Sequence, residues 1–129
     1  MIKLKDLLME KLKRKKSTSG EYMRLDFYDK GEHVGFTNIR LKKGWNQLHI
    51  EVKDEHQRKG YAYKFIEGNL DEYDYVVFPD DRVLNPMLFK VINKFKGKSK
   101  YDVFRNEKYN ETIIRNNPIN FNFIVLAVN

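Results

Sequence analysis

The chain has no cysteine, three prolines and one tryptophan among its 129 residues. The absence of cysteine excludes disulfides, thiolate metal sites and thiol nucleophiles, and it favours a reducing, cytoplasmic setting. No apolar run approaches the roughly 20 residues that a membrane-spanning helix needs. The opening residues, MIKLKDLLMEK, carry charges throughout and lack the apolar core of a signal peptide. We therefore expect a soluble, cytoplasmic protein that makes no membrane contact.

Familiar catalytic and metal-binding motifs are also missing. The three histidines, His33, His49 and His56, do not have the HExxH spacing of a zinc-binding helix. There is no GxSxG nucleophile motif and no Walker phosphate loop. We therefore expect no metal site, and neither serine-hydrolase nor P-loop chemistry.

The net charge of +7 is concentrated at one end of the chain. Residues 1–16 hold seven basic and two acidic side chains, so this segment contributes +5 and the remainder +2. Such a segment can bind phosphate polymers or membrane surfaces, or it can simply be a solvated helix face. Tyr22, Phe27 and Tyr28 interleave with charged residues, as in proteins that bind single-stranded nucleic acid. In a strand, however, such aromatics usually pack in the core or across strands.

Hydrophobic periodicity predicts the elements of the N-terminal half. The leucines of residues 2–15 recur on one helical face, which predicts an amphipathic helix within the basic segment 1–16. Alternation over 21–29 and 33–41 predicts a β-hairpin, and the apolar positions of 45–52 predict a third strand.

The C-terminal half is predicted to alternate between helices and strands. A helix should follow Gly60, a buried strand should span 73–79, and a helix with proline in its first turn should span 85–95. The segments YDVF at 101–104 and FNFIVLAV at 121–128 predict two more strands.

The predicted order α, β, β, β, α, β, α, β, β defines the fold class. The strand–helix–strand unit at 45–79 calls for a parallel pair joined by a right-handed crossover, and the flanking hairpins call for antiparallel pairing. We therefore expect one α+β domain over residues 1–129, with a mixed, mostly antiparallel sheet and flanking helices.

Residues 51–70, EVKDEHQRKGYAYKFIEGNL, place a glycine where a strand passes into a helix. A helix N-terminus exposes unpaired N–H groups and attracts anions. A phosphate can approach the backbone of Gly60 closely because glycine has no Cβ, and Lys53, Arg58 and Lys59 add positive charge. The stretch predicts either a phosphate-binding loop or an ordinary strand-to-helix turn with solvated charges.

The segment from Val52 to Ala62 resembles the acetyl-CoA signature of the GNAT N-acetyltransferase superfamily, whose core is R/Q-x-x-G-x-G/A. Gln57, Gly60 and Ala62 match that core, and Val52 stands where the family's strand ends in valine. The surrounding elements follow the family's order. The resemblance covers residues 21–97 best and the ends, including the C-terminal strands of 98–129, poorly.

The resemblance implies an acyl-CoA bound where a central pair of parallel strands splays apart. The pyrophosphate would lie on backbone N–H groups of the signature loop, and the pantetheine arm would pair with the strand edge at Ile50 and Val52. Asn85 would contact the cofactor, cap the next helix, or do both. The implied cofactor-binding residues are Ile50, Val52, Gln57, Arg58, Lys59, Gly60, Tyr61, Ala62 and Asn85.

Acetyl transfer to an amine needs a neutral nucleophile, a polarised thioester carbonyl and a proton for the leaving thiolate. Many family members place a base carboxylate on the strand before the loop, where Glu51 and His49 share one face. Both are candidate catalytic bases, and histidine has a pKa suited to that work. Both can equally be polar residues on a half-exposed strand.

The general acid is harder to identify. The family often supplies it from a tyrosine on the helix after the second central strand, but Ile92 occupies that position, and Gly97 is followed by lysine instead of phenylalanine. Tyr101 could replace it if the tail strand folds over the wedge. Asp80 and Asp81 could bind an amine substrate, or they could solvate a loop and cap a helix.

Two functions remain open from the sequence. The first is N-acyl transfer from acetyl-CoA to an amine on a small molecule or protein. The second is a GNAT-fold protein without catalysis that binds CoA, a partner protein or nucleic acid through its basic surface. Because few residues precede the first hairpin, a second copy of the chain could complete the acceptor site as a homodimer. The lysine-rich, compact sequence resembles phage-encoded members, which would act in the host cytoplasm.

Overall fold

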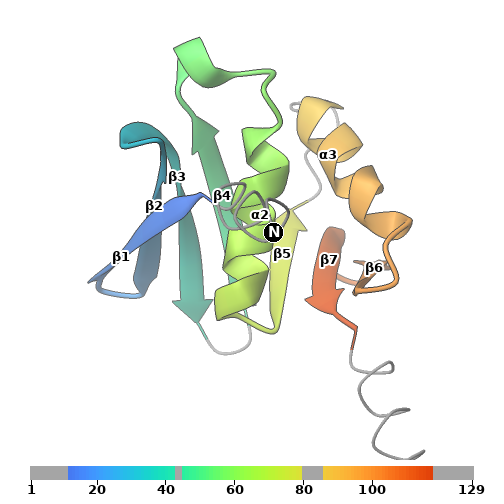
Figure 1. Cartoon of the computed structure of the whole chain (residues 1–129). Helices are drawn as coiled ribbons and strands as arrows, with labels where there is room; N and C mark the ends of the chain where they lie inside the picture. The colour runs from blue at the N-terminus through green and yellow to red at the C-terminus, as the bar shows by residue number, and fades with distance from the viewer. Residues whose placement is uncertain (1–11, 43–44, 80–85, 118–129) are drawn as a thin grey trace, which may run out of the picture.

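A computed structural model describes residues 12–42, 45–79 and 86–117. They form a seven-stranded sheet of order β1-β2-β3-β4-β5-β7-β6, with two α-helices and a short 3-10 helix (Figure 1). The elements are β1 (Lys13–Ser19), β2 (Tyr22–Asp29), β3 (Glu32–Lys42), β4 (Trp45–Val52), η1 (Asp54–His56), α2 (Tyr61–Glu72), β5 (Tyr75–Pro79), α3 (Pro86–Lys96), β6 (Tyr101–Asn106) and β7 (Glu111–Asn116).

The centre of the sheet is a parallel pair that separates along its length. β4 and β5 run in the same direction and share one paired position, Gln47 opposite Val77. The other strand pairs are antiparallel, and β4 stays paired with β3 as far as Val52 opposite Gly35. In Figure 1 the arrowheads of β4 and β5 diverge. The expected mixed, mostly antiparallel sheet with a splayed central pair is confirmed.

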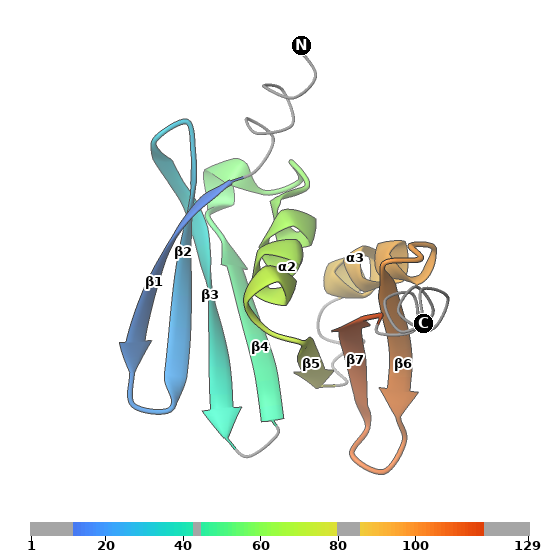
Figure 2. The ribbon, with the colours of Figure 1, turned by 60° about the horizontal axis from the view of Figure 1, so that its bottom comes forward.

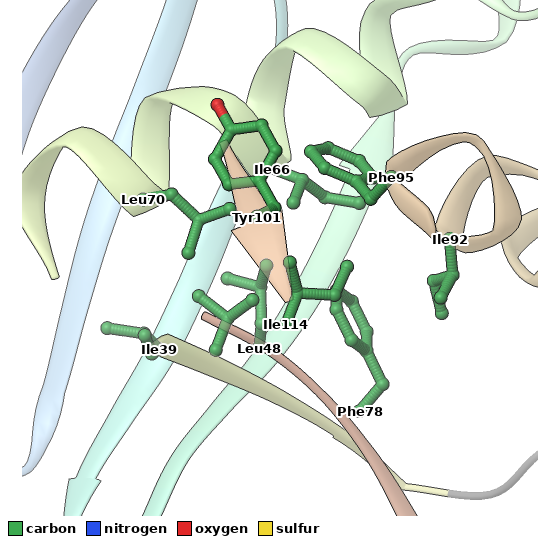
Figure 3. Close-up of a cluster of buried hydrophobic side chains, with 10 residues drawn as sticks. Ile39, Leu48, Ile66, Leu70, Phe78, Ile92, Phe95, Tyr101 and Ile114 are labelled. Carbon is green, nitrogen blue, oxygen red and sulfur yellow. The ribbon is translucent and has the colours of Figure 1, made fainter. Parts of the chain in front are cut away.

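The two helices share one hydrophobic core with the sheet. Figure 3 shows side chains of α2 and α3 pointing toward those of the strands. Tyr63 of α2 stacks on Phe95 of α3, with ring centroids 4.4 Å apart, and the two helices lie side by side (Figure 2). The buried members are Ile39, Leu48, Ile66, Leu70, Val76, Phe78, Ile92, Phe95, Tyr101 and Ile114.

A second core cluster lies under the N-terminal half of α2. Phe65 stacks on Phe27 of β2 with centroids 4.3 Å apart, and Leu25, Val34 and Tyr61 complete the buried set. A β-bulge shifts the register here, because Phe27 pairs with Gly35 whereas the next residue, Tyr28, pairs with His33 and Val34 is skipped. The carbonyl of Val34 then accepts a hydrogen bond of 3.0 Å from the Lys53 N–H. The cluster therefore fixes both the helix and the start of the loop after β4.

The predicted helix at 2–15 is wrong at its C-terminal end. Residues 13–16 belong to β1, which pairs with β2 from Lys13 opposite Tyr28 to Ser19 opposite Tyr22. Nothing apolar follows Leu12 in KRKKSTS, so a helix there would bury no face, whereas a strand gains a full ladder of backbone hydrogen bonds. The remainder of the predicted helix lies outside the described residues.

The C-terminal strands also differ from the prediction. β7, of sequence ETIIRN, was not predicted, and it lies between β5 and β6 and buries Ile114. The predicted strand at 121–128 lies outside the described residues. Within the described part of the chain, no helix is both long and apolar enough to cross a membrane.

Candidate functional site

The splay of the central strands leaves backbone groups of β4 available. Beyond Gln47, β4 has no ladder partner in β5, although its other edge stays paired with β3 up to Val52. Ile50 and Val52 are half-buried and pack against the core clusters, which hold the strand in place. A strand edge of this kind can accept an extended ligand through main-chain hydrogen bonds.

The loop from β4 ends at the N-terminus of α2, where no side chain caps the free backbone amide groups. Gly60 is the N-cap residue with φ 82° and ψ 11°, no side chain caps this end, and the first turn holds no acidic residue. A Cβ built on Gly60 would meet nothing within 4 Å, so the space beside its backbone is open. The first amide groups of α2 can therefore bind an anion.

Basic side chains surround this helix end. Arg58 adopts a left-handed backbone with φ 65°, which costs energy for a residue with a Cβ. Arg58, Lys59 and Lys53 are all exposed. Their charges add to the partial positive charge of the helix N-terminus, so the loop favours a polyanion such as a pyrophosphate.

The Gln57 side chain makes hydrogen bonds within the loop between β4 and α2. Its Nε2 donates to the Val52 carbonyl at 3.3 Å and to Asp54 Oδ1 at 3.2 Å. The side chain therefore bridges the strand end and η1 and does not point toward the amides of α2. In this arrangement Gln57 positions the loop, and a ligand strand along β4 would compete for the Val52 carbonyl.

Residues on both sides of the β2–β3 turn contact the loop between β4 and α2 and the first turn of α2. The Tyr61 hydroxyl donates to Asp29 Oδ2 at 2.5 Å, and this bond together with burial raises the pKa of Tyr61 to about 12. His56 Nε2 lies 3.2 Å from Glu32 Oε1. The sequence analysis missed this support, because partners 24 to 32 residues apart share no local motif.

The two candidate bases lie together on the sheet face opposite the core. His49 Nε2 is 3.2 Å from Glu51 Oε1, and the two side chains are 62% and 58% exposed. The Phe36 ring of β3 lies 6.5 Å from the His49 ring. The expected sharing of a face is confirmed, and the pair is open to solvent. Its catalytic role stays a prediction.

Other predicted site residues are not brought together. Asp80, Asp81 and Asn85 lie outside the described residues. Ile92 is 2% exposed within the core. Tyr101 is paired with Asn116 at the amino end of β5, away from the diverging carboxyl ends, and burial raises its pKa. The condition under which the sequence offered Tyr101 as the acid, a tail strand folded over the wedge, is therefore not met by β6.

A comparison with solved structures found chains described as acetyltransferases, all with TM-scores below 0.5. The ribosomal-protein-S18-alanine N-acetyltransferase from Escherichia coli shares 16% identity with a TM-score of 0.49, and the match covers 75% of this chain and 68% of that one. An acetyltransferase from Agrobacterium tumefaciens str. C58 shares 15%, with a TM-score of 0.44 and coverage of 74% and 60%. An aminoglycoside 6'-N-acetyltransferase complexed with coenzyme A shares 16%, with a TM-score of 0.43 and coverage of 74% and 71%.

At these identities the likeness concerns the fold alone. No protein-family model matches the chain, and no curated protein matches its sequence.

Proposed function

We propose that this protein is an acyl-CoA-dependent N-acyltransferase that moves an acetyl group from acetyl-CoA to an amine. The observation that carries the proposal is one juxtaposition. The Gln57-x-x-Gly60-x-Ala62 signature forms an uncapped, glycine-opened helix N-terminus directly after a strand whose far edge is unpaired. The helix end suits the pyrophosphate and the strand edge suits the amide-bearing pantetheine arm.

The reaction would proceed by direct attack of the amine on the thioester. A neutral amine nitrogen bonds to the acetyl carbon, the carbon–sulfur bond breaks, and the amine proton is lost while the CoA thiolate gains one. The His49–Glu51 pair is placed to accept the amine proton, because it is exposed beside the unpaired stretch of β4. Unpaired amide groups of β4 would polarise the thioester carbonyl. The proton for the thiolate can come from water.

The donor and the acceptor would approach from opposite faces of the sheet. α2 and its N-terminus lie on the core side, whereas His49 and Glu51 project from the other side, which neither α2 nor α3 covers. A pantetheine arm lying between β4 and β5 would carry the acetyl group from one face toward the other. The acceptor would then meet it beside Phe36, His49 and Glu51.

Thermal unfolding with and without acetyl-CoA tests the donor site. A ligand at about 100 times its dissociation constant stabilises by about 2.7 kcal/mol, which raises the midpoint of a domain this size by several degrees. We expect this rise with acetyl-CoA and CoA but not with ATP at equal concentration. No rise at millimolar acetyl-CoA would refute the proposal.

Two substitutions at one position separate charge from backbone strain. Gly60→Asn and Gly60→Asp both place a side chain of similar size at φ 82°, in space that is open, and both residue types tolerate this conformation better than most. We expect Gly60→Asp to lose the acetyl-CoA shift and Gly60→Asn to retain much of it, because only the carboxylate repels a pyrophosphate. Gly20→Asp, at a left-handed glycine in the β1–β2 turn, is the control and should leave the shift unchanged.

A further inference from the structure

A histidine and two glutamates converge beneath the signature loop. Glu32 is the first residue of β3, next to the β2–β3 turn, and Glu55 and His56 lie in η1, immediately before Gln57. One potential ligand atom from each of the three side chains lies within 4.8 Å of the others. Glu32 and Glu55 are exposed, whereas His56 is 7% exposed.

The imidazole of His56 is buried without a satisfied nitrogen among the described residues. Neither Nδ1 nor Nε2 makes a hydrogen bond of acceptable geometry with them, although Nε2 is 3.2 Å from Glu32 Oε1. The Tyr61 ring packs edge-on against the imidazole with centroids 5.9 Å apart, which fixes the ring from the core side. A buried polar nitrogen without a partner is costly, so a ligand or an ion at the imidazole would stabilise the fold.

The spacing of the three groups fits a small divalent cation. Ligands about 2.0–2.1 Å from a tetrahedral zinc ion lie about 3.3 Å from one another. The 3.2 Å between His56 Nε2 and Glu32 Oε1 is already close to that value. The Glu55 carboxylate lies within 4.8 Å of the other two ligand atoms, and its exposed side chain can change rotamer to approach them. Packing against Tyr61 holds the ring, and the two carboxylates are on exposed side chains that can adjust.

The ligand set selects the type of ion. Imidazole suits zinc and the later first-row transition ions, whereas magnesium and calcium prefer oxygen ligands alone. Two carboxylates and one neutral imidazole neutralise a divalent charge and leave a fourth position for water.

We propose that Glu32, Glu55 and His56 form a binding site for a divalent transition-metal ion of the zinc type. A bound ion would tie the β2–β3 turn to η1 and so brace the segment that leads into Gln57 and Gly60. The site adjoins the donor loop but uses none of the residues assigned to acetyl-CoA, and it does not depend on the proposed acyl transfer.

Titration calorimetry of the full, untagged chain with zinc chloride tests the site. We expect one zinc per chain, a higher thermal midpoint with zinc than with magnesium chloride, and tetrahedral visible absorption bands when cobalt(II) replaces zinc. Glu32→Gln and Glu55→Gln should each weaken binding at least about 10-fold, since the loss of even an outer-shell partner typically weakens metal binding 10- to 100-fold. Both side chains are exposed, so these variants should keep the fold.

The control uses another histidine–carboxylate pair of the same hairpin. His33 Nε2 lies 2.8 Å from Asp26 Oδ1, and His33→Gln should leave the zinc affinity unchanged. No zinc binding would overturn the proposal and leave an ion pair between His56 and Glu32 as the explanation of the cluster. Binding that survives both glutamate substitutions would overturn it equally. Neither result bears on acetyl-CoA binding, which is measured with zinc absent.

Discussion

The hydrogen bond between Tyr61 and Asp29 gives a quantitative test of what stabilises the start of α2 after the signature loop. Tyr61 is the first residue of α2 and is 9% exposed, and its hydroxyl donates to Asp29 Oδ2 at 2.5 Å. Tyr61→Phe removes that hydroxyl and keeps the ring, which stacks near Phe65 and packs edge-on against His56. The change therefore deletes one hydrogen bond without opening a cavity.

The expected cost follows from the partner's charge and exposure. A hydrogen bond to a charged group contributes about 1.5–3 kcal/mol, and the lower end applies because Asp29 is half-buried and can be rehydrated when the hydroxyl is lost. We expect Tyr61→Phe to lower the free energy of unfolding by about 1.5 kcal/mol at pH 7. For a domain this size the thermal midpoint should fall by roughly 4–8 °C.

The same bond predicts a difference at alkaline pH. The pKa of Tyr61 is raised to about 12 from an ordinary value near 10, so the unfolded chain releases this proton before the folded chain does. The stabilisation is complete below about pH 10 and is lost as the pH rises toward 12. The pKa values of Tyr63, Tyr73 and Tyr101 are also raised by burial, so the unmodified chain loses stability for several reasons. The gap between it and Tyr61→Phe should nevertheless narrow between pH 10 and 12.

Urea unfolding of both chains at pH 7, 9, 10 and 11 measures these values. Tyr22→Phe is the matched control, because Tyr22 is 48% exposed, and it should stay within about 0.5 kcal/mol of the unmodified chain. The proposed role of the Tyr61–Asp29 hydrogen bond would be refuted if Tyr61→Phe stayed within about 0.5 kcal/mol of the unmodified chain at pH 7. It would also be refuted if the difference in free energy of unfolding between the two chains did not narrow as the pH rises.

Two further substitutions test the packing and the electrostatics of the sheet. Gly35→Ala would bring a Cβ to 2.3 Å from a backbone oxygen of β4 and to 2.7 Å from Phe65. We therefore expect urea unfolding to show a free energy of unfolding lower by about 3 kcal/mol or more. The control is Gly97→Ala, whose Cβ would meet nothing within 4 Å and which should be nearly neutral. The hydrogen bond from Lys16 lowers the pKa of Glu72. Glu72→Gln should therefore lower the free energy of unfolding by up to about 1 kcal/mol at pH 7, and by progressively less below pH 4.5. Thermal midpoints of Glu72→Gln that fall equally at pH 7 and pH 3.5 would contradict this.

The sequence was most informative where local patterns decide the structure. Alternating residues predicted β2, β3 and β4, and the glycine and helical spacing after Gln57 predicted α2. The parallel pairing of β4 and β5 followed from the strand–helix–strand order. The elements depend on neighbours within a few residues, and the pairing of β4 with β5 followed from the order of the elements, both of which a single sequence displays.

The sequence failed where distant partners decide the structure. KRKKSTS has weak local preference, and its pairing with β2 makes it a strand. ETIIRN became a strand because β5 and β6 supply partners on both sides. The supports of the signature loop, Tyr61 with Asp29 and His56 with Glu32, join segments that only the folded sheet brings together.

The structure also bears on the choice between catalysis and passive binding. Arg14 and Lys16, half of the basic run at residues 13–16, form ion pairs of 3.2 Å with Glu72 at the end of α2. A surface evolved to bind a polyanion keeps its cations available, so this pairing weakens the case for the basic segment as a nucleic-acid site. The sheet face opposite α2 instead presents His49 and Glu51 next to the unpaired part of β4. The proposed transfer requires an exposed group that can accept the acceptor's proton at this place, whereas passive binding of CoA would require only the helix end and the strand edge.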